Sequence, residues 1–100
     1  MILKWGAIAG FWLILVAGAL AHRYAAGAVE VGAGYVAKEA CSCIFIGGRE
    51  LESCRHDMPD MMDDVDAEVL ADERAVRAFV TGLGERIARF EPDGGGCTLY

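Results

Sequence analysis

Sulfur and imidazole side chains are the groups in this chain with the clearest potential for chemistry. Thiolate and thioether ligands suit Cu(I), whereas cysteine combined with histidine suits zinc. The spacing lacks the Cys-x-x-Cys pairs that zinc sites normally use, so a metal site is an alternative hypothesis rather than the leading one. Its candidate ligands are Cys41, Cys43, Cys54 and His56, with Met58, Met61 and Met62 close behind them in the sequence.

The same cysteines could instead form disulfides. Four cysteines in an exported chain are typical of a disulfide framework, and they allow three pairings. Cys41 and Cys43 lie too close together for an unstrained bridge within one strand. Free buried thiols, which pack as small hydrophobic groups, are the competing interpretation. The residues by themselves leave both possibilities open.

The serines offer no nucleophilic site. Ser42 and Ser53 are the only two, and neither begins the Ser-x-x-Lys motif in which a lysine helps to activate the serine. Ser53, His56 and Asp57 are the residue types of a triad, but adjacency in sequence does not supply its geometry. We therefore expect no catalytic residue in this chain.

Acidic side chains gather between residues 57 and 66. A calcium loop needs a glycine at its turn, and none is present there, so a solvated acidic face is the expected structure. From Tyr24 onward the chain has seven basic and fifteen acidic residues, a net charge of −8. This balance argues against a nucleic-acid partner. The single Gly-Ala-Gly at residues 32–34 is too weak a signal for a nucleotide, so no cofactor is expected.

The N-terminus has the pattern of a membrane-targeting segment. Residues 5–21 are uncharged and mostly apolar, with Lys4 before them and His22 and Arg23 after them. As a helix, 17 residues span about 25 Å, and snorkelling of Lys4 makes up the shortfall against a hydrocarbon core of about 30 Å. Residues 1–23 are thus interpreted as a signal-anchor or as a signal peptide cleaved after Ala21, and a buried helix of a soluble fold is the remaining alternative. The two leading interpretations export the rest of the chain.

A glycine-rich stretch follows, and residues 24–34 are interpreted as a linker. Residues 35–40 could form a short helical turn, and residues 41–46 either a buried strand or an apolar helix end. Residues 49–64 are polar, contain Pro59, and are expected to be a loop with a short helical piece.

Alternating apolar and polar residues predict strands in the remaining sequence. Residues 65–71, 76–80 and 86–90 each have this period of two, and glycines or charged residues separate them. A helix over residues 67–80 is the rival prediction. Residues 97–100 form an apolar, strand-like run at the end of the chain. The expected fold is α+β: an N-terminal transmembrane or signal helix followed by a small antiparallel β-meander.

Two blocks of residues carry a resemblance to a known family. Residues 34–50 are similar to a Tyr-x-Ala-Lys-x-x-Cys-Ser-x-x-Phe-(Val/Ile)-x-Gly-Arg block, and the chain ends with a Gly-Cys-Thr-Leu block. Together they resemble the N-terminal, pre-catalytic segment of β-lactamase-related serine hydrolases of the 6-aminohexanoate-dimer hydrolase type. The matching residues are Tyr35, Ala37, Lys38, Cys41, Ser42, Phe45, Gly48, Arg49, Gly96, Cys97, Thr98 and Leu99. Cys43 and Cys54 depart from the pattern.

The resemblance implies a membrane-anchored flanking segment of a serine amide or ester hydrolase. Residues 35–100 would be an incomplete domain whose partner is the catalytic domain, contiguous or separately encoded. The expected location is the inner membrane, with the body exported. Because Cys41 and Cys97 lie in the two family-like blocks, the resemblance also suggests that they form a disulfide. A metal-binding or redox protein, and a membrane span with a disordered acidic tail, are the alternatives.

Overall fold

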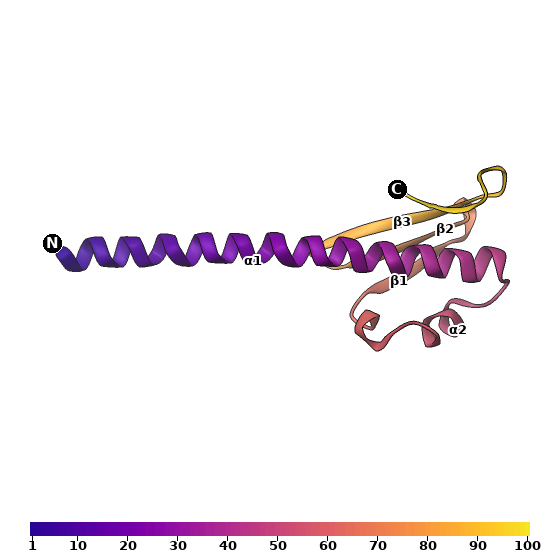
Figure 1. Cartoon of the computed structure of the whole chain (residues 1–100), viewed down its shortest axis with the longest axis horizontal. Helices are drawn as coiled ribbons and strands as arrows, with labels where there is room; N and C mark the ends of the chain where they lie inside the picture. Colours follow the sequence, from indigo (N-terminus) through magenta and orange to yellow (C-terminus); the bar gives the residue numbers. More distant parts are fainter.

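The structure is a computed structural model that describes all of residues 1–100. One helix, α1 (Ile2–Cys41), makes up two fifths of the chain. At 1.5 Å per residue it is about 60 Å long, which accounts for most of the 68 Å length of the molecule. Figure 1 shows its N-terminal half projecting alone, whereas its C-terminal half lies against a sheet.

The chain reverses direction after α1 through a series of short helical pieces. A π-helical turn, η1 (Ser42–Ile46), extends α1, and α2 (Leu51–His56) and a 3₁₀ turn, η2 (Asp60–Met62), follow. A Cβ atom at Gly47 would lie 2.6 Å from the carbonyl oxygen of Cys43, and Gly48 has a φ of +69°. Gly47 is required because a larger residue would collide with the carbonyl oxygen of Cys43. Gly48 is favoured because glycine adopts a left-handed backbone without strain.

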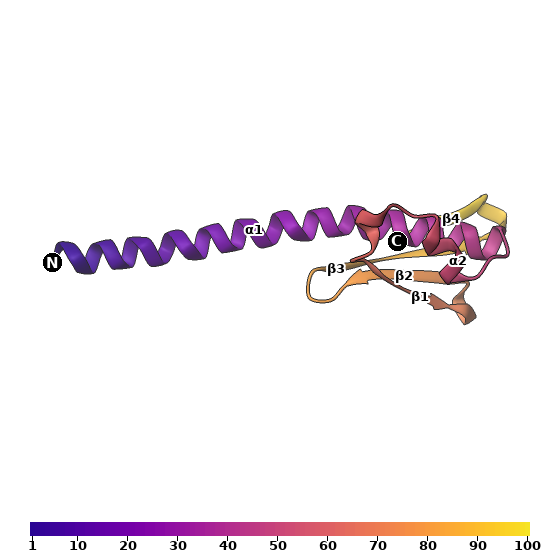
Figure 2. The same cartoon turned by 90° about the horizontal axis from the view of Figure 1, so that it is seen from below.

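The rest of the chain forms a four-stranded antiparallel meander. Its strands follow one another in space as they do in sequence, so β1 and β4 are the two edges. The β2–β3 turn points back toward the projecting half of α1 (Figure 2). The strands are β1 (Asp66–Leu70), β2 (Ala75–Val80), β3 (Gly84–Glu91) and β4 (Gly96–Leu99).

Each connection between strands uses a residue with positive φ. A 3₁₀ turn, η3 (Ala71–Glu73), ends at Arg74 with a φ of 52°. Gly82 supplies this conformation between β2 and β3. A second 3₁₀ turn, η4 (Pro92–Gly94), is followed by Gly95 with a φ of 87° before β4. These turns keep the strands short and adjacent.

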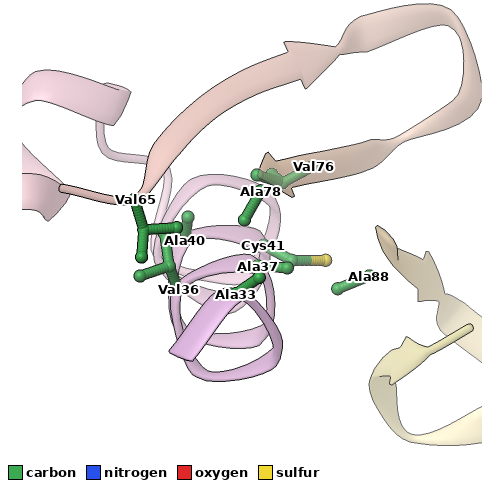
Figure 3. Packing of buried hydrophobic residues seen from close by; sticks show 9 residues of the cluster. All are labelled: Ala33, Val36, Ala37, Ala40, Cys41, Val65, Val76, Ala78 and Ala88. Carbon is green, nitrogen blue, oxygen red and sulfur yellow. The ribbon is translucent and has the colours of Figure 1, made fainter. Parts of the chain in front are cut away.

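The core lies between one face of the sheet and the last three turns of α1. Small side chains dominate it, so the helix packs close to the strands (Figure 3). Half-buried side chains close its ends, and the rings of Phe45 and Phe90 stack with their centroids 6.4 Å apart. The buried cluster is Ala33, Val36, Ala37, Ala40, Cys41, Val65, Val76, Ala78 and Ala88.

The structure differs from the sequence-based expectation for residues 24–34, which are helical rather than a flexible linker. Each glycine in a helix costs roughly 1 kcal/mol relative to alanine. Here the apolar helix precedes the segment and packed turns follow it, so helix propagation through it needs no new nucleus. Gly34 is buried, and a Cβ there would touch Leu99.

Other expectations can be compared directly. Residues 35–40 are the end of α1 rather than an isolated turn, and residues 41–46 are a helix end rather than a strand. The predicted fold class and meander are confirmed, because β1, β2 and β3 fall on the three alternating runs. The rival helix over residues 67–80 is wrong. The apolar run at the end of the chain forms β4, which pairs with β3.

Candidate functional site

The C-terminal end of α1 is where most of the candidate residues lie, and two disulfides determine its geometry. The first bridge joins Cys41, the last residue of α1, to Cys97 in β4, with the Cα atoms 6.1 Å apart. It closes a separation of 56 residues. This bridge links the two ends of the body, because it fastens the helix to the last strand of the sheet.

The second bridge joins Cys43 of η1 to Cys54 of α2, with the Cα atoms 6.0 Å apart. Residue-based reasoning did not single out this pair. Its signal was indirect: once Cys41 pairs with Cys97, only these two cysteines remain. Arg55 holds the same segment from its other side, because its Nη2 donates to the carbonyl oxygens of Val65 at 2.6 Å and Met62 at 3.3 Å.

The two disulfides argue against the metal-site hypothesis. All four cysteines are oxidised, and a disulfide sulfur is not the thiolate that a soft metal ion requires. His56 is exposed, Met61 is exposed, and Met58 and Met62 pack against the core. The structure brings together no group of three histidine, cysteine or carboxylate residues that could hold a metal ion.

Ser53, His56 and Asp57 do not form a triad in the structure. Arg49 engages two of them instead: its Nη2 donates to Ser53 Oγ at 2.7 Å, and its Nη1 donates to Asp57 Oδ2 at 2.6 Å. His56 accepts no proton from the Ser53 hydroxyl, so the serine is not activated. The cluster is exposed and acts as a clamp that closes the loop around α2.

The predicted acidic cluster is a solvated face. Its five carboxylates all lie exposed, and among them only Asp57 takes part in an ion pair. None lies in the buried environment in which carboxylates perform general acid–base chemistry. The members are Asp57, Asp60, Asp63, Asp64 and Asp66.

Charged side chains also cover the face of the sheet that α1 does not contact. Arg77 lies over the Phe79 ring, 4.0 Å from its centroid, and binds both Glu68 and Glu85. The hydrogen bond to Glu85 raises the pKa of the Arg77 guanidinium above its usual value. This network follows from register, because Arg77 stands opposite Glu68 and diagonal to Glu85. Arg77, Glu68 and Glu85 thus form a structural network of surface ion pairs.

Tyr100 makes a second, separate set of polar contacts. The Tyr100 hydroxyl donates to a carboxylate oxygen of Glu91, and Arg89 lies over the tyrosine ring. The hydrogen bond to Glu91 raises the pKa of the Tyr100 phenol. The backbone N–H of Tyr100 also continues the β3–β4 ladder to Ile87 at 2.8 Å.

The projecting half of α1 has the opposite character. It is apolar on every side and is long and apolar enough to cross a membrane. Its large side chains lie in the open, as shown by exposed fractions of 61% for Trp12, 69% for Leu13 and 72% for Ile14. In water such a surface would be a strong aggregation site, so it needs a lipid or protein environment.

The arrangement as a whole is therefore an apolar helix joined to a four-stranded sheet by a disulfide. Comparisons of the chain with protein-family models, with curated proteins and with solved structures find no match.

Proposed function

We propose that this protein is the membrane anchor and docking module of a serine amide or ester hydrolase of the β-lactamase-related family. Its exported body would hold the catalytic domain at the surface of the inner membrane and extend that domain's sheet. The observation that carries this proposal is the continuity of α1. The same helix is exposed and apolar at its start and buried against the sheet at its end.

Continuity makes the anchor mechanically stiff. The helix between the apolar segment and the body has no break, so the sheet cannot swing freely on a flexible tether. The bridge from Cys41 to Cys97 then transmits this fixed position to β4, the last strand. A domain that docks on β4 is thereby held at a defined height and orientation above the membrane.

The two sheet edges differ in the way that a docking site requires. Exposed Asp66 and Glu68 flank the outer side of β1, and charge on an edge strand discourages further pairing. No charged residue occurs in β4, and its backbone forms ladder hydrogen bonds with β3 alone. An added strand would therefore pair with β4.

The occupant that we assign to this edge is the catalytic domain of the hydrolase. This part of the proposal rests on the resemblance, in which the catalytic domain follows the Gly-Cys-Thr-Leu block that here forms β4. The absence of Ser-x-x-Lys agrees with a non-catalytic role for this segment. The metal-binding alternative has no comparable support, because the disulfides remove the thiolates that it needs.

A labelling experiment in native membranes tests the proposal. Membranes that contain the affinity-tagged chain are treated with a fluorescent fluorophosphonate, which labels activated serines, and the tagged material is purified. We expect a labelled hydrolase that either binds the chain or carries the tag itself. Purification of the chain with no labelled serine enzyme would reject the hydrolase assignment.

Two edge variants show which strand is used. Thr98→Lys places a charge on the β4 edge and should release a separately encoded labelled enzyme. Asp66→Lys is the comparison on β1, where a lysine likewise replaces an exposed side chain that makes no ion pair. Equal recovery of a separately encoded labelled enzyme with both variants would contradict docking at β4.

A further inference from the structure

A hollow of about 520 Å³ lies where α1 leaves the body on its N-terminal side. One wall is the helix around Ala26 and Gly27, and the other is the tip of the β2–β3 hairpin. Figure 2 shows this hairpin pointing back along α1 toward the projecting half. The volume is within the range of small-ligand sites, and the small helical residues leave its floor open.

The height of this hollow above the membrane follows from the helix geometry. The apolar run ends at Ala21, so His22 and Arg23 mark the boundary of the hydrocarbon core. Glu30 is eight residues from His22, about 12 Å along the helix axis. A headgroup layer is roughly 5–8 Å thick on each side of the core. The hollow thus extends across the headgroup layer, and its outer end lies just beyond that layer.

Charge is ordered along the same axis. The basic residues that line the hollow, His22 and Arg23, are on the membrane side, and the carboxylate of Glu30 is farther out along the helix. Arg23 makes no ion pair within the chain, and Glu30 has only a long contact of 3.5 Å with Arg86. These two groups therefore keep hydrogen-bonding capacity for a ligand.

We propose that this hollow binds the headgroup of a phospholipid that has both a phosphate and a primary ammonium, of the phosphatidylethanolamine class. The phosphate, which is next to the glycerol, would accept hydrogen bonds from Arg23. The ammonium, which extends outward, would donate to Glu30. Both contacts are charge-assisted, and a primary ammonium has the three donors that a trimethylammonium lacks. The inference rests on the proposed membrane insertion of α1.

Lipid titration of the full chain tests this assignment. The detergent-solubilised protein is titrated with phosphatidylethanolamine, phosphatidylcholine and phosphatidylglycerol of identical acyl chains, and bound lipid is counted by native mass spectrometry. Phosphatidylethanolamine should bind about tenfold more tightly than either of the others, which is the loss expected when a charged hydrogen bond is missing. Equal binding of the three lipids would overturn the proposal.

Three variants locate the site. Glu30→Gln should abolish the preference for phosphatidylethanolamine over phosphatidylglycerol, and Arg23→Gln should weaken the binding of all three lipids. Glu39→Gln is the matched control, because Glu39 is an exposed carboxylate on the same helix but outside the hollow. A preference that survives Glu30→Gln, or that is lost equally with Glu39→Gln, would show that lipid binds elsewhere.

Vesicle flotation separates this inference from the proposed function. A chain that does not float with phosphatidylcholine vesicles is not inserted, and both proposals then fail. A chain that floats but has no preference among the three lipids retains its anchor role, and only the headgroup site is rejected.

Discussion

The two halves of α1 are equally helical and equally free of proline, yet they have opposite surroundings. Residues 2–24 project into the open, whereas residues 33–41 have a face buried against the sheet. Their side chains differ. The first half includes large exposed side chains such as Trp5 and Phe11. The second has alanines at its contact positions, which allow the strands to come close.

Charge reinforces the contrast. Residues 5–21 have no charged side chain, so every face of this segment suits lipid. The second half has Glu30, Lys38 and Glu39 on its exposed side. One continuous helix therefore has a surface suited to lipid along its first half and a surface with an exposed, charged side along its second half. Exposure and composition together, rather than hydrophobicity alone, distinguish a span from a core helix.

The largest expected effect comes from removing the bridge that only the buried half has. Replacement of Cys41 and Cys97 by serine should lower the free energy of unfolding by about 4 kcal/mol, because the bridge closes a separation of 56 residues. Chemical unfolding of the body in detergent, followed by near-ultraviolet circular dichroism, measures this. Serine at Cys43 and Cys54 is the comparison, with about 3 kcal/mol expected for the shorter loop.

Tryptophan fluorescence gives this experiment an internal control. Both tryptophans, Trp5 and Trp12, lie in the projecting half. Their emission in vesicles should stay unchanged when the body unfolds after loss of the bridge between Cys41 and Cys97. A red shift that follows body unfolding would mean that the two halves are not independent.

A charge in the projecting half should affect membrane insertion rather than the stability of the body. Leu13→Arg places a guanidinium near the centre of the apolar segment and should disfavour insertion by about 2.5–3.5 kcal/mol. Carbonate extraction of membranes measures the inserted fraction, and Leu13→Ala is the control for lost side-chain volume. In the fraction that still inserts, and whose body is therefore exported, both disulfides should form. Normal retention of Leu13→Arg in the membrane would argue against a span at this position.

A matched pair of valines compares the two sides of the packed half directly. Val36 is fully buried, whereas Val31 is 76% exposed on the same helix. Val36→Ala should destabilise the body by about 1–3 kcal/mol, whereas Val31→Ala should change it by less than about 0.5 kcal/mol. Urea unfolding measures both. Similar losses for the two variants would show that α1 does not pack as described.

The smallest expected effect is at the end of the chain. The hydrogen bond to Glu91 raises the pKa of Tyr100 above its usual value of 10.0. The contact stabilises the neutral phenol in the folded state. Its contribution to the free energy of unfolding is therefore complete below pH 10 and is lost as the pH rises through the folded-state pKa of Tyr100. Absorbance titration near 295 nm of the wild type minus Tyr100→Phe isolates the phenol. A difference curve centred at or below the usual value would contradict the contact.

The fold class could be predicted from sequence because its signals are local. Alternation marks β1 and β2, and the long uncharged run marks the start of α1. The helical state of residues 24–34 could not be predicted, since three glycines oppose it locally, whereas propagation from the preceding helix and packing at Gly34 and Ala33 favour it. Tertiary contact overrode propensity there.

The site was only partly predictable, for a similar reason. Disulfide pairing depends on distances across the fold, and the pair Cys43–Cys54 has no sequence signal apart from its being left over. The clamp of Arg49 on Ser53 and Asp57 requires the reversal of the chain at Gly47, which periodicity does not show. The hollow beside His22 forms only because the β2–β3 hairpin lies back along α1.

The central claim is that one unbroken helix joins a membrane span to an oxidised, exported body. Protease treatment of intact spheroplasts that express the full chain, combined with a thiol-reactive gel-shift reagent, tests it most directly. We predict that the body is digested from outside while a short N-terminal piece stays in the membrane, and that all four cysteines react only after reduction. A protected body with four reactive thiols would contradict the account.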